Sequence, residues 1–589
     1  MRRLLSASVS AIALSLLLAG AALADVPKAR IEGVEDRVLR NALEDAVGEV
    51  EEEPTSRVDA RRRATEAASM AYALLRSEGY YQAEIEPTVS ETDPPQAILK
   101  IRPGERFTFG EAQVLWVGTA PSTTAQGAAF EALEIEPGQP GRAAVVLGAE
   151  GRVVAAVQQE GYPDAAARPR DVVVDYAATS VVPTFRIEAG DLVRLDGVVV
   201  MTDGRTKPRY VQRLAPWTPG DVFDPDDVAE LERRLQEVGV YNSVTVALAP
   251  KEQATAEGLR PVIVSLSDRP PRTIELGAGY STTEGIGIDA RWLNYNRLGR
   301  FDTITLVAKL AAIQQKLDLE LALPHWRRPD QRLRIGGGFI GDRTDAFDDY
   351  GAGVRTDVEW RFRRTSYITG GLSLDYVATF DKTVTTPSWQ NLFIATVLGA
   401  FALDRSDDVL NPQRGWRIEA RLEPTGITGD VTLAYLKAQV QGSYYLPFGD
   451  STVLAFRTRL GTIAGGNIPD VPISRRFFAG GGGSVRGYAY QGVGPRLSNN
   501  TPQGGLSLVE VSGEVRRKIF DRWSGVLFVD AGSVGLKTAP DFNDLSVGVG
   551  VGVRYDLGFG PIRFDIAAPL NRRTGDPPFQ IYISIGQAF

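Results

Sequence analysis

From Arg272 to its last residue, the chain alternates apolar residues with polar or very small ones at a period of two. Across Val547–Val553 every second residue is a valine, and across Lys316–Leu323 every second residue is a leucine. Successive side chains of a β-strand point to opposite faces, so this pattern predicts strands with one apolar face. No stretch after residue 24 is apolar for long enough to be a membrane helix. A chain of this kind that crosses a membrane therefore has to do so as a closed β-barrel.

Three further features favour a membrane barrel over a soluble β-sandwich, which would also bury an apolar face. The predicted strands number about 16, an even count that suits a single-chain barrel. The connections tend to alternate between short and long. The tryptophans that fall near predicted strand ends, where an aromatic girdle would lie, are Trp292, Trp326, Trp360, Trp389, Trp416 and Trp523. We therefore predict a transmembrane antiparallel β-barrel over residues 271–589, with the lipid bilayer around it.

The chain before residue 271 mixes helical and strand patterns and repeats at a spacing of roughly 80 residues, a period typical of tandem small domains. Each copy reads as β-α-α-β-β, and the predicted α+β domains span residues 25–104, 105–190 and 191–270. The third copy is predicted to contain strands at 193–200, 243–248 and 261–266 and helices at 207–214 and 225–238. A small sheet of this kind can leave one edge open to a strand from a partner, and the alternative is a set of spacer domains.

The first 24 residues have the pattern of a secretory signal peptide. A basic start precedes an apolar run at 11–18 and small residues before Asp25. We therefore expect export, with the barrel in a bacterial outer membrane and the repeats in the periplasm.

The composition disfavours several classes of function. The chain contains no cysteine and one histidine, His325, which disfavours thiol chemistry, a Ser/His/Asp arrangement and a histidine-based metal site. We therefore expect no enzyme, no catalytic or metal-binding residues and no cofactor. A net charge of -8 disfavours nucleic acid as a partner. His325 follows Pro324 near a predicted strand end, where we expect a solvated turn residue.

A glycine-rich segment, Arg475–Tyr488, places four consecutive glycines, Gly480–Gly483, ahead of Arg486. Such a loop has little side-chain bulk and carries a permanent cation into a confined space, and a flexible surface loop is the alternative. The repeats lie on the side where the first barrel strand begins. Counting strands from there places the segment between strands eleven and twelve on the outer side. It is long enough to fold back into the lumen.

The predicted thirteenth strand supplies a carboxylate for that cation. Asp530 shares a face with Phe528 and Gly532, while the apolar residues at 527, 529 and 531 face lipid. We expect Asp530 to pair with Arg486 and to hold the loop in place; hydration of both charges in a wet lumen is the alternative. We call the expected group the loop lock. Its residues are Arg486, Gly487, Tyr488, Phe528, Asp530 and Gly532.

Several segments resemble motifs of the BamA/TamA superfamily. Arg476–Tyr488 resembles its signature loop and Phe528–Gly532 its companion strand motif, and segments 405–415 and 560–565 are similar to others. The ending Phe579–Phe589 resembles the barrel-recognition signal of such proteins, carried here by Ile583, Ile585 and Phe589. Three N-terminal repeats, called POTRA domains in the family, favour a TamA-like member. BamA-like members usually carry more repeats, and two-partner secretion porins usually carry fewer.

The resemblance implies a factor that inserts or assembles outer-membrane proteins such as autotransporters, with unfolded outer-membrane proteins as its clients. It also implies a TamB-like, periplasm-spanning partner that docks on the first repeat. The alternative function is the outer-membrane terminus of a conduit for phospholipid or polypeptide between the membranes.

A physical route for assembly lies in the first barrel strand, expected at 273–282. This strand has to pair with the last one, but it is short, and Gly277 and Gly279 weaken it. An imperfect seam leaves unpaired backbone groups that are costly in lipid, and a client strand can satisfy them by β-augmentation. Bilayer thinning beside the seam would lower the barrier to insertion. Ile274 and Leu276 are the expected lipid-facing residues of this strand.

Overall fold

The computed structural model describes residues 26–281, 285–449, 451–558, 561–585 and 587, so the predicted signal peptide lies outside the described residues. The chain divides into two compact units. The first comprises the described residues up to Gly197 with Trp217–Val228 and Ala249–Pro261, and the second comprises Val198–Pro216, Ala229–Leu248 and the chain from Val262 onward. No helix of the described chain is long and apolar enough to cross a membrane.

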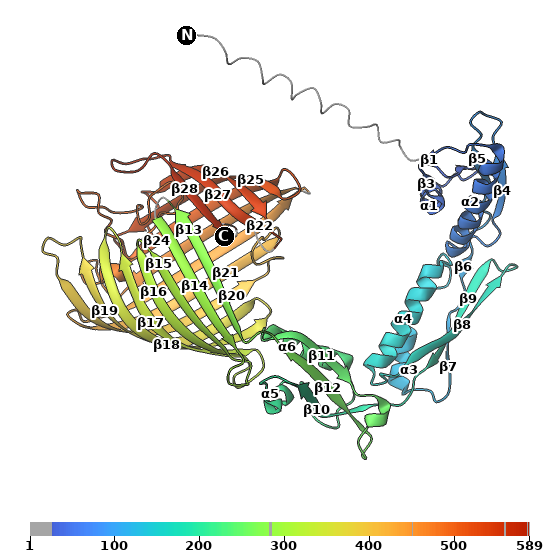
Figure 1. The fold of residues 1–589 in the computed structure, drawn as a ribbon, viewed down its shortest axis with the longest axis horizontal. Helices are drawn as coiled ribbons and strands as arrows, with labels where there is room; N and C mark the ends of the chain where they lie inside the picture. Colours follow the sequence, from blue (N-terminus) through green and yellow to red (C-terminus); the bar gives the residue numbers. More distant parts are fainter. Residues whose placement is uncertain (1–25, 282–284, 450, 559–560, 586, 588–589) are drawn as a thin grey trace, which may run out of the picture. The chain divides into compact units, whose positions relative to one another are not determined.

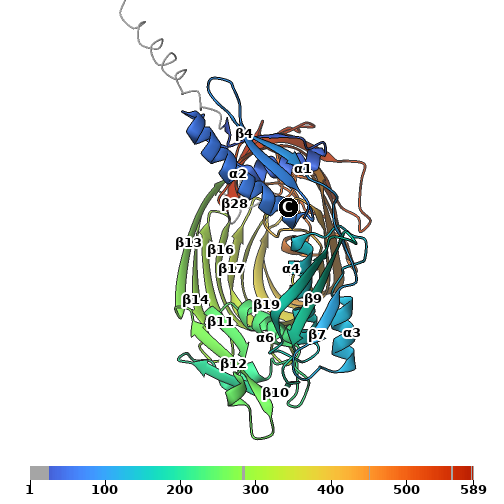
Figure 2. The same ribbon diagram turned by 90° about the vertical axis from the view of Figure 1, so that its right-hand side faces the viewer.

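The N-terminal part forms three sheets of three or four strands and one two-stranded sheet, with accompanying helices (Figure 1, Figure 2). Their strand orders are β2-β5-β4, β6-β9-β7 with β8 on β9, and β10-β12-β11, while β1 pairs with β3. The strands are β1 Val26–Pro27, β2 Arg30–Glu32, β3 Glu49–Val50, β4 Glu84–Val89, β5 Ala97–Arg102, β6 Thr108–Phe109, β7 Gln113–Trp116, β8 Ala166–Asp175, β9 Ser180–Glu188, β10 Arg194–Thr202, β11 Tyr241–Leu248 and β12 Leu259–Asp268. The helices are α1 Arg37–Val47, α2 Arg57–Ser77, α3 Thr123–Glu131, α4 Ala143–Gln159, α5 Pro208–Gln212 and α6 Pro225–Glu237. The third group follows the order β-α-α-β-β, and the first two add short strands to it.

Helix α2 shows how the local sequence produces these elements. The Ser56 hydroxyl accepts a hydrogen bond from the backbone N–H of Asp59 at 3.2 Å, which caps the first turn. Alanines recur every three or four residues from Ala60 to Ala71, and with Leu75 they form a buried stripe. This stripe packs into the core beneath the first sheet.

Sixteen strands, β13–β28, form a closed antiparallel barrel in which each strand pairs with its sequence neighbours. Figure 1 shows them running from green β13 to red β28, which lie beside each other where the barrel closes. The strands are β13 Arg272–Ser281, β14 Gly285–Tyr295, β15 Thr303–Ala311, β16 Gln314–Leu323, β17 Gln331–Arg343, β18 Phe347–Arg363, β19 Ser366–Asp381, β20 Trp389–Asp404, β21 Gly415–Gly429, β22 Leu433–Phe448, β23 Thr452–Ala464, β24 Ser507–Lys518, β25 Trp523–Gly535, β26 Ser546–Asp556, β27 Pro561–Pro569 and β28 Gln580–Ile585. The predicted fold class, small α+β repeats followed by an antiparallel barrel of about 16 strands, is confirmed.

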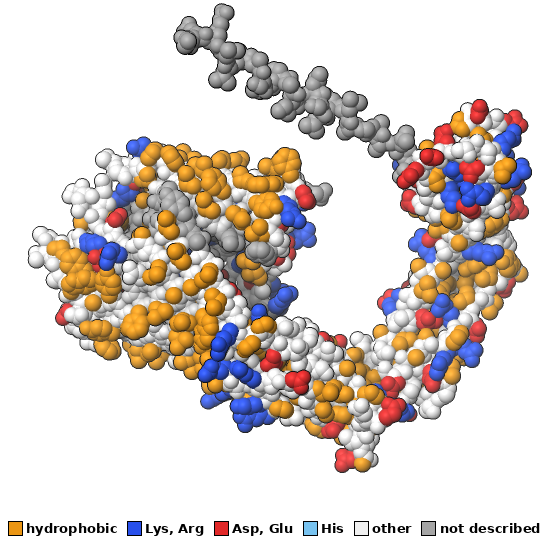
Figure 3. Space-filling model, in the orientation of Figure 1, with side chains coloured by type: hydrophobic (Ala, Val, Ile, Leu, Met, Phe, Trp, Pro, Cys, Tyr) orange, Lys and Arg blue, Asp and Glu red, His pale blue; other side chains and the backbone are white. Residues whose placement is uncertain are grey.

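The two faces of the barrel wall differ as the alternation predicts. Leu527 and Val529 are exposed on the outside, whereas Asp530 between strands β24 and β26 is fully buried on the inside. Figure 3 shows the hydrophobic side chains spread over the outer wall. The wall is uneven, because β18 has 17 residues while β27 has 9 and β28 has 6.

The structure contradicts the expectation that His325 is a solvated turn residue. Its side chain is buried, and the residue is 7% exposed. His325 Nδ1 accepts a hydrogen bond from the backbone N–H of Asp330 at 3.1 Å, and Nε2 donates to the carbonyl of Arg234 in helix α6 at 3.3 Å. The histidine is buried because a helix 91 residues earlier in the chain packs on this turn. The local sequence around His325 contains no sign of that contact.

Further contacts within the second unit join the segment around α5 to the same end of the barrel. Arg213 Nη2 donates to the carbonyls of His325 and Trp326, each at 3.1 Å. Asn296, in the turn between β14 and β15, donates from Nδ2 to Thr206 Oγ1 at 2.7 Å. The third sheet is thus attached to the first two turns at this end of the barrel.

Candidate functional site

The glycine-rich segment leaves β23 and returns to β24 through the barrel lumen. Val485, Arg486 and Tyr488 are all buried, with Arg486 only 1% exposed although its side chain is a cation. A guanidinium so far from water requires anionic partners within reach. Those partners come from the inward faces of strands β24, β25 and β27.

Arg486 and Asp530 form a two-pronged ion pair. Arg486 Nε donates to Asp530 Oδ2 at 2.6 Å and Nη2 donates to Oδ1 at 2.9 Å, and the backbone N–H of Arg486 donates to Oδ2 at 3.1 Å. The guanidinium carbon lies 3.5 Å from the centre of the Phe528 ring, in a cation–π arrangement. Charge-assisted bonds of this bidentate kind fix the orientation of both groups, so they hold the loop in one position.

Two carboxylates that the sequence analysis did not single out share the same guanidinium. Arg486 Nη1 lies 2.7 Å from Glu514 Oε1 and 3.2 Å from Asp565 Oδ2. Glu514 also pairs with Arg516 at 2.8 Å, and Asp565 also pairs with Arg554. Each is an acidic residue at an inward position of its strand, and the same alternation identified Asp530.

The acidic residues of this group are arranged for arginine and not for a metal ion. In the part of the chain that the structure describes, no three His, Cys, Asp or Glu side chains are placed to hold a metal. Asp565 lies 3.5 Å from Arg563 Nε, so it too has arginine partners on more than one side. The chemistry of the site is therefore the holding of a loop by ion pairs.

Glycines on the inner wall make room for the loop. A Cβ added at Gly548 of β26 would lie 1.9 Å from the carbonyl oxygen of Arg486. A Cβ at the predicted site residue Gly532 would lie 2.6 Å from Val485 Cγ2. The valine–glycine alternation of β26 therefore does two things. It supplies a lipid-facing row of valines, and it clears the inner face where the loop passes.

The four-glycine run has a structural requirement at three of its positions. Gly480 and Gly481 have φ values of 108° and 101°, a region that favours glycine. A Cβ at Gly482 would lie 2.8 Å from Cδ1 of Tyr582, whereas a Cβ at Gly483 would meet nothing within 4 Å. The run lets the loop turn tightly and lie against the aromatic ring of the last strand.

Tyr582 connects the loop lock to the last barrel strand. The backbone N–H of Gly487 donates to Tyr582 Oη at 3.2 Å, and Tyr582 Oη donates to the carbonyl of Tyr488 at 3.3 Å. Tyr582 is also the residue that lies opposite Ser281 of β13. One buried side chain therefore contacts the loop and belongs to the strand pair that closes the barrel.

We call the junction of β13 and β28 the seam. Among the described residues one register pair crosses it, Ser281 with Tyr582. By contrast, β13 pairs with β14 along all of Arg272–Ser281. The pair at the seam lies at the end of β13 farthest from the periplasmic repeats, since β13 begins where β12 ends.

The predicted seam-strand residues lie in β13. Ile274 and Leu276 are 70% and 78% exposed and occupy outward positions. Gly277 faces Asp289 of β14, whose carboxylate would lie 2.6 Å from an added Cβ. Gly279 pairs with a glycine of β14, so small residues stand on both strands there.

The predicted C-terminal signal is described only in part. Ile583 is outward and half exposed, and Ile585 ends β28 opposite Ile562 of β27. Phe589 lies outside the described residues. The role of all three as a recognition signal stays a prediction.

Comparison with known proteins identifies both parts of the chain. Residues 296–589 match the Omp85 superfamily domain, and residues 28–103 match the first POTRA domain of TamA. The chain is 22% identical over 542 residues to the outer membrane protein assembly factor BamA of Neorickettsia risticii, over 85% of this chain and 69% of that protein. It is 24% identical over 429 residues to BamA of Nitratidesulfovibrio vulgaris and spans 52% of that relative's length, with 69% of this chain covered.

A solved structure shares the fold. BamA from Haemophilus ducreyi lacking POTRA domains 1–3 aligns with a TM-score of 0.67 and 17% identity, over 82% of this chain and 100% of that chain. With the matched domains, this places the barrel in the bacterial outer membrane and the POTRA part in the periplasm. The chain therefore belongs to the Omp85 superfamily, the group of outer-membrane barrel proteins that includes BamA and TamA.

Proposed function

We propose that this protein inserts or assembles β-barrel clients, such as autotransporters, in the outer membrane, and that the client strand enters at the seam. The protein acts as a catalyst of folding and performs no bond chemistry, and the free energy comes from folding of the client. The observation that supports this most is the contrast between the two sides of β13: β14 pairs with it along all of Arg272–Ser281, whereas among the described residues one register pair, Ser281 with Tyr582, joins it to β28. Tyr582 is also held from inside by the loop.

The seam suits an incoming strand. Backbone groups at a strand edge are costly in lipid, and β-augmentation by a client strand would satisfy them. The described part of the last strand is also short, since β28 has 6 residues and a membrane strand needs roughly 9–11. A short wall favours local thinning of the bilayer, which lowers the barrier to insertion.

The contents of the lumen favour assembly over a conduit for polypeptide. Tyr488 and Val485 pack in a buried cluster with residues of the barrel wall, and Arg486 is held by three carboxylates. A polypeptide that passed through the lumen would have to displace this loop and break buried ion pairs, which is strongly unfavourable. A phospholipid conduit makes no such demand and is the second candidate function.

The first repeat is the proposed docking site of a TamB-like partner. It matches the first POTRA domain of TamA, and its sheet ends in β4, which pairs with β5 on one side. An edge strand of this kind can accept a strand from another chain.

A reconstitution experiment tests the proposed function. The full chain is placed in liposomes, a urea-unfolded autotransporter barrel is added, and client folding is followed by its heat-modifiable gel mobility. We expect faster folding than in liposomes that contain an unrelated outer-membrane barrel. Equal folding rates would contradict the proposal, and transfer of labelled phospholipid between liposomes without client folding would favour the conduit.

The cysteine-free chain allows a self-controlled version of the experiment. Cysteines replacing Ser281 and Tyr582 lie at the register pair of the seam and can form a disulfide across it. The oxidised variant should lose its effect on client folding. The reduced form lacks the Tyr582 hydroxyl as well, so it isolates the effect of the crosslink and should be more active than the oxidised form. Full activity of the oxidised form would show that the seam is not the point of entry.

A further inference from the structure

The outer wall of the barrel is covered at one place by its own loop. Val509 of β24 and Ser533 of β25 are register partners on the lipid-facing side, in the same row as the exposed Leu527 and Val529. Yet Val509 is 1% exposed and Ser533 is 4% exposed. The loop between β25 and β26, residues 536–545, folds outward over them.

Two hydrogen bonds hold this loop against the wall. Thr462 Oγ1 donates to the carbonyl of Thr538 at 2.8 Å, and Ser507 Oγ donates to the carbonyl of Ala539 at 3.0 Å. Thr462 and Ser507 are register partners on adjacent strands, so both anchors lie on the same outward row. The loop follows an odd-numbered barrel strand and therefore lies at the extracellular end. We call residues 538–540 the roof.

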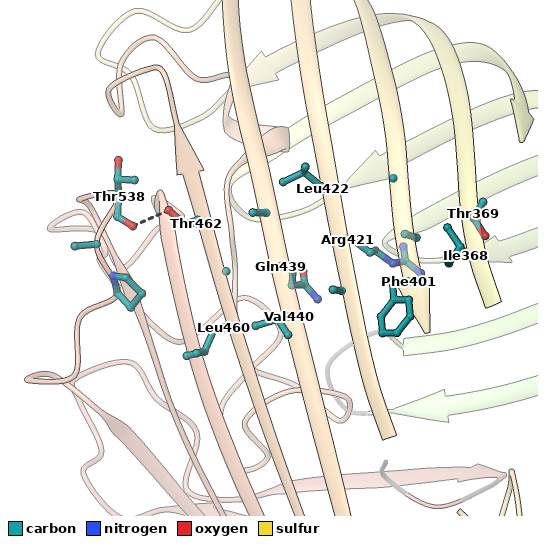
Figure 4. Close-up of a pocket in the computed structure, with 17 residues that line it drawn as sticks. Ile368, Thr369, Phe401, Arg421, Leu422, Gln439, Val440, Leu460, Thr462 and Thr538 are labelled. Carbon is teal, nitrogen blue, oxygen red and sulfur yellow. Dashed lines mark hydrogen bonds between the residues drawn. The ribbon is translucent and has the colours of Figure 1, made fainter. Parts of the chain in front are cut away.

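A hollow of about 980 Å³ lies on the outer wall beside the roof and crosses β19 to β23 (Figure 4). Its floor consists of small residues at outward positions, which are Gly399, Ala420 and Ala438. Larger outward side chains border the floor, among them Phe401, Val440 and Leu460. In Figure 4 the bond between Thr538 and Thr462 marks the roofed end.

The bilayer surrounds this wall, so the chemistry that fits the hollow is that of a lipid. An acyl chain lying on a convex barrel wall touches protein on one side only. In the hollow an acyl chain would contact the floor, both borders and the roof. Dispersion attraction grows with the number of such contacts. Lys537 is exposed next to the roof and offers a cation to a headgroup phosphate.

We propose that the hollow is a binding site for one acyl chain of a lipopolysaccharide, the lipid of the extracellular leaflet, held under the roof with a phosphate of its headgroup at the extracellular rim. The site is separate from the seam, because β21 at its centre is the ninth of the sixteen barrel strands and lies across the barrel from the seam. This proposal rests on the outer-membrane location alone and not on the proposed assembly function.

Photo-crosslinking of lipid tests the proposal. The full chain is reconstituted in vesicles of phosphatidylethanolamine and phosphatidylglycerol that contain lipopolysaccharide with a diazirine in one acyl chain. After irradiation, adducts are mapped by mass spectrometry of peptides. We expect adducts on the hollow in excess of those on Leu319 and Phe339, which are outward and at least as exposed as the residues that border the hollow. Adducts spread evenly over the outer wall would overturn the proposal.

Two variants make the comparison specific. Ala438→Phe fills the floor of the hollow, whereas Ala395→Phe adds the same side chain at an exposed outward position outside it. The first variant should lose most adducts in the hollow, and the second should keep them. If Ala438→Phe does not show the heat-modifiable mobility of a folded barrel, Gly399→Leu replaces it. Unchanged adducts in a folded, filled variant would show ordinary bilayer contact only.

Discussion

A single guanidinium, that of Arg486, lies against carboxylates from three strands of the barrel wall. Burial of such charges is costly, and the cost is recovered only while every partner is in place. The lumenal loop is therefore most sensitive to single substitutions among these charged residues and along its path, and two predictions concern such substitutions.

Arg486→Ala should lower the free energy of unfolding by ~3–5 kcal/mol, because the buried carboxylates lose their shared partner. Asp530→Asn should also destabilise the barrel, and the double variant should lose less than the sum of the two. Urea unfolding in detergent, read by gel mobility, measures all three.

Arg291→Ala is the matched control, since its partner Glu275 is 3.5 Å away and both side chains are half exposed. The control should change by less than ~1 kcal/mol. Strict additivity would refute the coupling between loop and wall.

The glycines of the loop path predict a second pair of variants. Gly548→Ala places a Cβ where the carbonyl of Arg486 lies, so it should displace the loop and cost ~1–3 kcal/mol. Gly483→Ala has no atom within 4 Å of its new Cβ and should be tolerated within ~0.5 kcal/mol. Protease cleavage of the loop in intact vesicles provides an independent measure of its displacement. If the two variants behave alike, the loop does not lie against β26.

At this scale the sequence shows which residues are inward but not which of them meet. Asp530, Glu514 and Asp565 all occupy inward positions of their strands, but the sequence pattern pairs only Asp530 with Arg486. Glu514 lies in β24, next to β25, and Asp565 lies in β27, two strands beyond β25. The position of the loop between these strands depends on closure of the barrel.

At the scale of elements, the strands are readable from sequence because a lipid-facing row and a lumenal row differ so strongly in polarity. The sequence also predicts the last helix of the third repeat closely: the expected range is 225–238, and the helix is Pro225–Glu237. What the pattern cannot show is contact between elements far apart in sequence. His325 illustrates this, since its burial depends on Arg234 of α6.

Burial lowers the pKa of His325, while the hydrogen bond to the Arg234 carbonyl and the carboxylates of Asp330 and Glu237 offset part of this effect. His325 Nδ1 accepts a hydrogen bond from the backbone N–H of Asp330, so a proton added at Nδ1 would point at that N–H group. A histidine whose pKa is lower in the folded than in the unfolded state stabilises at high pH. That stability is lost as pH falls below its ordinary pKa of about 6.5.

The attachment of the third sheet to the barrel turns should therefore loosen between pH 7.5 and pH 5.5. Spin labels on cysteines introduced at the exposed Arg209 and Arg328 report this as a broader distance distribution at low pH. His325→Gln keeps a polar side chain that does not titrate and should remove the pH dependence. An unchanged distribution in the parent chain would show that His325 does not control the attachment.

At the scale of the whole molecule, the sequence was sufficient for the fold class, because alternation, strand count and repeats all depend on local pattern. The seam was predictable only as a weakness of strand one. That the last strand meets it at Ser281, through a tyrosine also bound to the lumenal loop, follows from closure of the barrel and not from any local signal. The same closure makes the loop, the last strand and the seam one connected unit.

The central claim is that clients enter at the seam, and site-specific photo-crosslinking in living cells tests it most directly. A photoreactive residue is placed at Ile274 or Leu276, which are outward on β13, and at Phe339 as an outward control on β17. We predict adducts between the β13 positions and the terminal strands of other outer-membrane barrels, and none from Phe339. If the β13 positions capture only the protein's own β28 or lipid, the seam is closed to clients and the account is contradicted.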